Sequence, residues 1–184
     1  MQTQQPRLGR QIVGVALCLS VICCGAAGDL FAQEQERPSS VVKDIVKEVV
    51  LDPTTFAPSI IAYDATIRDW KTSQPFFKNG FVEQNSRYTI TGLPNDRPLN
   101  YGDGNRRIFL DAMTTLGTSL AHNALERTIE RGLVERHPEH RRLIRTLGWV
   151  ERISFGVGMS YVLSIEHYRQ AQANAAQASA LGLR

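Results

Sequence analysis

The stretch RRIFLDAMTTLGTSLAHNALERTIERGLVER, residues 106–136, decides the fold together with the segment that follows it, PEHRRLIRTLGWVERISFGVGMSYVLSIEHYRQ, residues 138–170. Both carry apolar residues every three or four positions, which is the period of an α-helix with one buried face. His137-Pro138 separates them, because proline disfavours the helical conformation in the residue before it. We therefore expect a long C-terminal hairpin of two helices, over 106–136 and 138–177. The side chains expected to face inward are Leu110, Met113, Leu116, Leu120, Ala124, Ile129 and Leu133 in the first helix, and Leu143, Leu147, Val150, Val157, Tyr161, Ile165 and Tyr168 in the second.

The second of these helices also carries a stripe of small residues. Gly156, Ser160 and Ser164 recur every four positions, and such a face permits two helices to approach closely. The weakly charged stretches of the hairpin, Ala112–Leu125 and Ile153–Ile165, are 14 and 13 residues long. They are too short to span a bilayer, which takes about 17–25 residues, so we expect them to form the core.

Two shorter helices are expected before the hairpin. Residues 41–51, VVKDIVKEVVL, place their apolar side chains on one helical stripe and their charges on the other, and Asp52-Pro53 ends that helix. A second helix is expected over 58–71, with Pro58 in its first turn, where proline is tolerated. Pro75 is expected to end it.

The connection to the hairpin is less regular. Residues 75–86 hold three phenylalanines and fit either a short helix or a β-hairpin, and residues 87–91 fit an isolated extended piece. Residues 91–105 are dense in Gly, Pro, Asn and Asp and are expected to form a loop, functional or disordered. Asp103 or Asn105 is expected to cap the next helix.

The fold class predicted is therefore mainly α, with four to five helices, a long C-terminal helical hairpin and little or no β. Residues 41–177 are expected to form a single helical domain, preceded by a polar lead over 33–40. The Ala/Gln-rich end of the chain has little to bury, so residues 178–184 are expected to fray.

The first 32 residues have the pattern of a secretory signal peptide. Arg7 and Arg10 give a cationic start, and a run of 17 apolar and small residues follows from Ile12 to Gly28. Cleavage after Ala27 or Ala32 fits this pattern; the alternative is an uncleaved anchor, because 17 residues is the lower limit of a membrane span. The basic flank stays cytoplasmic in both cases. We therefore expect a periplasmic or extracellular domain, free or held at the inner membrane by that anchor.

Composition excludes several classes of function. All three cysteines lie in the N-terminal segment, so the exported part has no disulfide, no thiolate nucleophile and no cysteine-bound metal. The net charge of +3 is too small to indicate binding to nucleic acid. Arg141, Arg145 and Arg152 are expected to lie on a solvated helix face. Contact with a membrane is expected only through an uncleaved N-terminal segment.

Few residues carry a chemical signal. His122 and Glu126 are four apart and so share a helical face, and His167 follows on the second hairpin helix. Histidine and carboxylate are groups that acid–base catalysis and metal binding use. The sequence has no HExxH, no G-x-S-x-G and no phosphate-binding glycine loop, so we expect no cofactor and no metal site. Ordinary hydrogen-bonded positions in the core are the other interpretation of these three residues.

A short pattern points to a second group of polar residues. The run Asp69-Trp70-Lys71-Thr72-Ser73 is followed by Gly80-Phe81-Val82-Glu83-Gln84-Asn85, and His167 lies near the end of the chain. This resembles small uncharacterised bacterial envelope proteins, in which an Asp and a Ser or Thr precede Gly-x-x-Glu-x-Asn and a histidine lies on the last helix. Here Ser86 stands where a proline usually follows the Asn. The resemblance implies an envelope location and no known activity. It also implies a polar cluster, structural or a binding site, of Asp69, Ser73, Glu83 and Asn85.

The function predicted from the sequence is that of an exported, envelope-associated helical domain with a structural or interaction role. Its expected partner is an envelope protein or a second copy of itself. The alternative is a metal-binding protein or acid–base hydrolase that uses His122, Glu126 and His167. An enzymatic role has the weaker support, because the sequence contains no complete catalytic motif.

Overall fold

The computed structural model describes residues 38–183. The predicted signal peptide over 1–32 and most of the polar lead lie outside the described residues. Within them the chain forms four α-helices and two 3-10 turns, which confirms the predicted fold class. In chain order these are α2 (Pro38–Leu51), α3 (Pro53–Lys78), η1 (Ser86–Tyr88), α4 (Tyr101–Arg136), η2 (Pro138–His140) and α5 (Arg141–Ala180).

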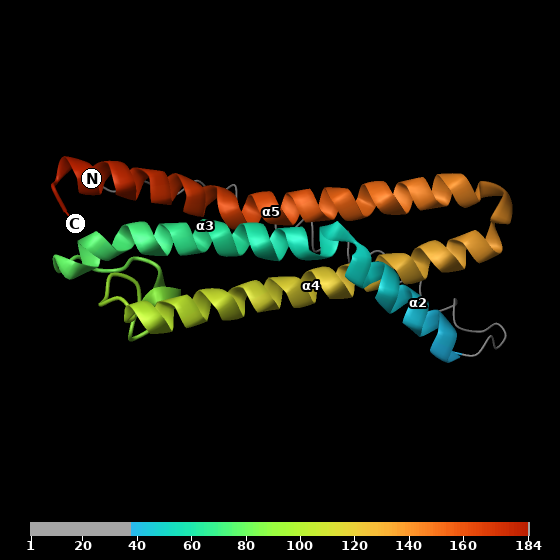
Figure 1. The fold of residues 1–184 in the computed structure, drawn as a ribbon, viewed down its shortest axis with the longest axis horizontal. Helices are drawn as coiled ribbons and strands as arrows, with labels where there is room; N and C mark the ends of the chain where they lie inside the picture. Colours follow the sequence, from blue (N-terminus) through green and yellow to red (C-terminus); the bar gives the residue numbers. More distant parts are fainter. Residues whose placement is uncertain (1–37, 184) are drawn as a thin grey trace.

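The helices form an elongated bundle in which α3 lies between α4 and α5, the two arms of the hairpin (Figure 1). Helices α3 and α5 run in the same direction, and α4 runs opposite to both. The tip of the hairpin extends past the start of α3, and α2 crosses this region and packs mainly on α4 (Figure 1). The long C-terminal hairpin predicted from the sequence is therefore confirmed, and α3 is the element that both of its arms contact.

The break between α2 and α3 follows from local chemistry. Asp52 is the N-cap of α3, and its carboxylate accepts a hydrogen bond of 3.0 Å from the backbone N–H of Thr54. Pro53 occupies the first position of α3, where its missing N–H costs no helical hydrogen bond. The sequence predicted the stop at Asp52-Pro53, but α3 begins directly after it and not at Pro58.

Helix α3 also continues past Pro75, so the predicted end before that residue is wrong. The reason is burial: Phe76 is buried, and the ring of Phe77 packs 5.5 Å from that of Trp70. The Asn79 side-chain amide donates to the Pro75 carbonyl at 2.8 Å, which supplies a hydrogen bond at the helix end. The undecided segment over 75–86 is thus partly the last turn of α3.

Helix α4 begins at Tyr101, five residues before its predicted start. Its N-cap is Asn100, whose side-chain oxygen accepts from the backbone N–H of Asp103 at 2.8 Å, so the predicted caps Asp103 and Asn105 are wrong. Gly104 explains why the first turn packs so closely, because a Cβ there would lie 2.2 Å from the Trp70 ring. Two isolated bridges, Glu83 with Asp96 and Thr89 with Pro98, order the preceding connection, and no strand forms among residues 38–183.

The buried face of α5 is the stripe of small residues. The prediction that its apolar residues face inward is wrong for the first half of the helix. Gly156, Ser160 and Ser164 are buried, which confirms the close approach expected of them. A Cβ at Gly156 would lie 3.5 Å from Thr54, so α3 passes directly over this stripe. Five side chains that were predicted to face inward are exposed instead: Leu143, Leu147, Val150, Val157 and Tyr161. On α4 the prediction is also partly wrong, because Leu110, Met113 and Leu133 are exposed.

The main apolar cluster lies near the other end of α3. Ile67, Trp70, Tyr88 and Ile108 form it, and Phe77 and Leu99 pack against it. The expectation of fraying from 178 is wrong for its first residues: α5 remains helical to Ala180, and Ala171, Asn174 and Ala178 are buried. Among the described residues, no helix combines the length and apolar character needed to cross a membrane.

Candidate functional site

A pocket of about 690 Å³ opens between the C-terminal halves of α3 and α5. The connecting segment over 81–86 forms its third wall. Asp69, Ser73, Glu83 and Asn85, the four residues of the predicted polar cluster, all line this pocket. His167, on α5, lines the same pocket.

An aspartate–histidine pair joins the two helices in this pocket. The Nδ1 atom of His167 lies 2.8 Å from Oδ2 of Asp69, so Nδ1–H donates to the carboxylate. The side-chain amide of Asn174 donates to Oδ1 of Asp69 at 3.2 Å and to Oγ of Ser73 at 2.9 Å. Ser73 in turn donates to the backbone carbonyl of Asp69. These contacts fix the carboxylate and the imidazole relative to each other. The Ser73 hydroxyl donates to a backbone carbonyl, so no contact among the described residues directs its proton to a base.

Glu83 is the second acid of the pocket and has a different environment. Its carboxylate accepts from the backbone N–H of Asn85 at 2.7 Å, and its own backbone pairs with Asp96. Burial raises the pKa of the Glu83 carboxyl above its ordinary value of 4.5, and the nearby charge of Asp69 raises it further. No lysine or arginine lies within ion-pair distance of Glu83 in the described part of the chain.

The predicted pair His122 and Glu126 lies elsewhere in the bundle. The ring of His122 stacks on Phe155 with centroids 3.6 Å apart, and its Nε2 lies 3.1 Å from a carboxylate oxygen of Glu151. Burial, and then the charge of Glu151, raises the pKa of Glu126. Glu151 precedes His167 by 16 residues on one helix, a separation of about 24 Å at 1.5 Å per residue. The structure therefore does not bring His122, Glu126 and His167 into one site.

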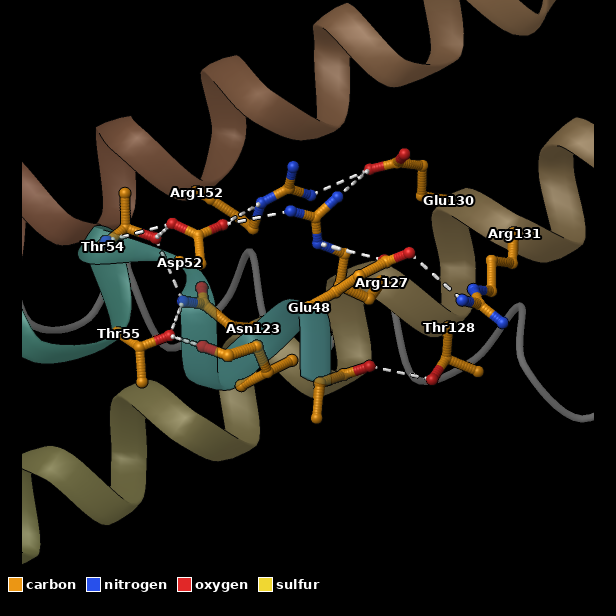
Figure 2. A network of polar contacts seen from close by, with 12 residues as sticks. Glu48, Asp52, Thr54, Thr55, Asn123, Arg127, Thr128, Glu130, Arg131 and Arg152 are labelled. Carbon is orange, nitrogen blue, oxygen red and sulfur yellow. Dashed lines mark hydrogen bonds and ion pairs between the residues drawn. The ribbon is translucent and has the colours of Figure 1, made fainter. Parts of the chain in front are cut away.

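A third polar cluster, a buried ion network, fills the junction of α2, α3, α4 and α5 (Figure 2). The Arg152 side chain is 2% exposed, and it contacts Asp52 at 3.2 Å and Glu130 at 2.9 Å. Arg127 contacts the same two carboxylates at 3.2 and 3.6 Å. Its position between them is visible in Figure 2, where Glu48 and Arg131 extend the chain of contacts. The solvated position expected for Arg152 is wrong.

Asp52 and Glu130 each contact two arginines in this network, which suits a structural role. Burial raises the pKa of Asp52, but hydrogen bonds from Thr54 and the charges of Arg152 and Arg127 outweigh it and hold the pKa below 3.8. Asn123 continues the network toward α3 by donating to Thr55 Oγ1 at 2.7 Å. Sequence reasoning missed this network, although it marked Asp52-Pro53 as a helix end and placed Arg152 on a helix face.

The outward face of α5 carries a row of six exposed positions at the spacing of a coiled coil, and five of them hold large apolar side chains. Steps of four, three, four, three and four residues separate its members, and a helix with this spacing packs against another helix. The five apolar members are 46–64% exposed, so nothing in the described chain covers them. We call this row the α5 seam; it consists of Leu143, Leu147, Val150, Ser154, Val157 and Tyr161.

Comparison with protein-family models, with curated proteins and with solved structures gives no match for this chain. The class that the structure itself defines is a mainly α-helical bundle built on a C-terminal hairpin. Three features of the structure bear on function: the pocket, the buried ion network and the α5 seam. In the described residues no group of three or more His, Cys, Asp or Glu has the arrangement of a metal site.

Proposed function

We propose that this protein is an exported helical domain of the cell envelope that acts by assembling with a second copy of itself through the α5 seam. The observation that carries the proposal is the exposure of an apolar row with heptad spacing. Soluble monomers rarely leave a contiguous apolar surface of this kind uncovered, and such surfaces mark sites of association. The basic and apolar start of the sequence and the resemblance to bacterial envelope proteins support the envelope location.

The heptad spacing of the α5 seam favours another helix, and not a flat protein surface, as its binding partner. Residues 143–161 cover about 27 Å of helix length at 1.5 Å per residue, enough for two and a half heptads of knobs-into-holes packing. A second α5 supplies a matching row, and a two-fold axis lets each copy cover the other with the same residues. Self-association thus buries the seam without a further partner.

Catalysis has less support than assembly. The acid–base alternative requires His122, Glu126 and His167 to act together, but Glu151, which contacts His122, lies about 24 Å along α5 from His167. His122 is engaged with Glu151 and Phe155, contacts that account for it as a packed residue. The proposed role is therefore that of a structural or interaction protein.

Light scattering coupled to size-exclusion chromatography tests the proposal. We expect light scattering to give twice the monomer mass for the purified chain at micromolar concentration. Val157→Glu is expected to give a monomer, because each copy would then bury a carboxylate in an apolar interface. Gln172→Glu adds the same charge to an exposed position of α5 outside the seam and is expected to leave the dimer intact.

Circular dichroism shows whether Val157→Glu keeps the helical fold, so that loss of the dimer is not mistaken for unfolding. A wild-type protein that is monomeric throughout the concentration range would overturn the assembly proposal. So would equal effects of Val157→Glu and Gln172→Glu. Intact full-length protein dissolved in the cytosol of its native cell would overturn the proposed export.

A further inference from the structure

The pocket between α3 and α5 has a composition that self-assembly does not explain. Its volume of about 690 Å³ lies in the range of sites for small molecules. It lies against the C-terminal half of α5, whereas the α5 seam occupies the first half. Occupation of the pocket and pairing through the seam are therefore separate properties of the molecule.

The charge of the pocket is negative. Asp69, Glu83 and Glu166 line it, and no lysine or arginine is among the described residues that do so. Arg169 neutralises Glu166 at the exposed rim, at 3.0 Å. Asp69 accepts hydrogen bonds from the His167 ring and the Asn174 amide, but Glu83 has no basic partner apart from the nearby imidazole. A half-buried carboxylate without a cation is costly, so the site favours a ligand that brings a positive charge.

The other residues that line the pocket favour an organic cation over a metal ion as its ligand. The rings of Trp70, Phe76, Phe77, Phe81 and Tyr88 line the pocket beside the carboxylates. Aromatic faces attract ammonium groups and accommodate the carbon chain that bears them. A metal ion instead needs three or more converging ligands, and the described residues contain no such group.

We propose that this pocket binds a small organic ammonium compound, with the carboxylate of Glu83 as the counter-ion of its charged nitrogen. The rings of Phe76 and Phe81 pack with centroids 5.6 Å apart and provide a wall for the carbon chain. The amides and hydroxyls on the pocket wall, among them Asn85 and Ser73, offer hydrogen-bond partners for further polar groups of the ligand. The Asp69–His167 pair fixes the distance between the two helices that form the walls.

Isothermal titration calorimetry with 1,4-diaminobutane tests the proposal, with butane-1,4-diol as the neutral analogue of the same length. We expect saturable binding of the diamine at one molecule per chain and no detectable binding of the diol. Glu83→Gln is expected to weaken diamine binding at least about tenfold, because it removes the charge and keeps the shape. Glu135→Gln, on the exposed end of α4, removes a charge outside the pocket and is expected to change the affinity less than about twofold.

Several results would overturn the assignment. These are equal binding of diamine and diol, an affinity unchanged by Glu83→Gln, the same loss with Glu135→Gln, or no saturable binding to the wild-type protein. Saturable binding of Mg²⁺ that excludes the diamine would also overturn it, in favour of a metal site. The unfolding temperature of Glu83→Gln, measured in parallel, shows whether the variant is folded during the titration.

Discussion

The two ends of α3 carry polar clusters that both contain carboxylates but differ in the cations that face them. At its start, Arg152 and Arg127 lie between Asp52 and Glu130, and Arg152 is almost completely buried. Near its end, the pocket holds carboxylates without an arginine, and the cluster stays open. We call these the closed end and the open end of the bundle.

The difference shows how charge pairing decides whether a polar cluster is filled or left accessible. A buried carboxylate is tolerated when guanidinium groups and hydrogen bonds satisfy it, and the helices can then close around it. The open end lacks those partners, so its helices enclose a pocket. The closed end therefore fixes the architecture, and the open end is available to a ligand.

The largest effect is expected from breaking the closed end. Arg152→Met removes one of the two guanidinium groups that Asp52 and Glu130 share, and leaves both carboxylates to Arg127 alone. We expect a loss of about 3–5 kcal/mol in the free energy of unfolding, measured by urea denaturation.

Arg145→Met is the matched control, because Arg145 is exposed on the same helix. Its effect is expected to stay within about 0.5 kcal/mol. Adding Glu130→Gln to Arg152→Met is expected to recover part of the stability, since it removes one of the two negative charges that are then left to Arg127. Equal losses for the two arginine variants would contradict a structural role for the network.

A smaller effect is expected from crowding the open end. Gly104→Ala places a methyl group 2.2 Å from the Trp70 ring, so the first turn of α4 must move away from the pocket wall. We expect a loss of about 1–3 kcal/mol in the free energy of unfolding. Gly117→Ala, in open space on the same helix, is expected to stabilise the protein by about 0.5–1 kcal/mol. A stabilising Gly104→Ala in the same denaturation experiment would show that this contact is not tight.

The sequence predicted the hairpin, its break and the small-residue stripe because each has a local signal. Periodicity marks helices 106–136 and 138–177, and His137-Pro138 marks the turn between them. Periodicity does not say which of two faces is buried, and on α5 both a small stripe and an apolar row were present. Close packing on α3 selected the small stripe, so the apolar row became the exposed seam.

The pocket was only partly predictable. Asp69, Ser73, Glu83 and Asn85 came from a short pattern, and the structure adds Asn174, more than 100 residues away from Asp69 and Ser73 in sequence. Asn174 lies in the Ala/Gln-rich segment, where the sequence offers no apolar period that would indicate burial. The ion network was missed for a similar reason, because pairing between distant helices leaves no trace in local spacing.

The pH dependence of the two ends has the smallest expected effect on stability, and opposite signs. The lowered pKa of Asp52 contributes stability above pH 3.8 that is lost as the pH falls through its folded-state value. The raised pKa of Glu83 contributes stability at low pH that is lost as the pH rises from 4.5 through its folded-state value. The carboxyl ¹³C chemical shifts of these two residues, followed by NMR against pH, test the contrast between the closed and open ends most directly. We predict a midpoint below 3.8 for Asp52 and above 4.5 for Glu83, and titration of both at their ordinary values would contradict the account.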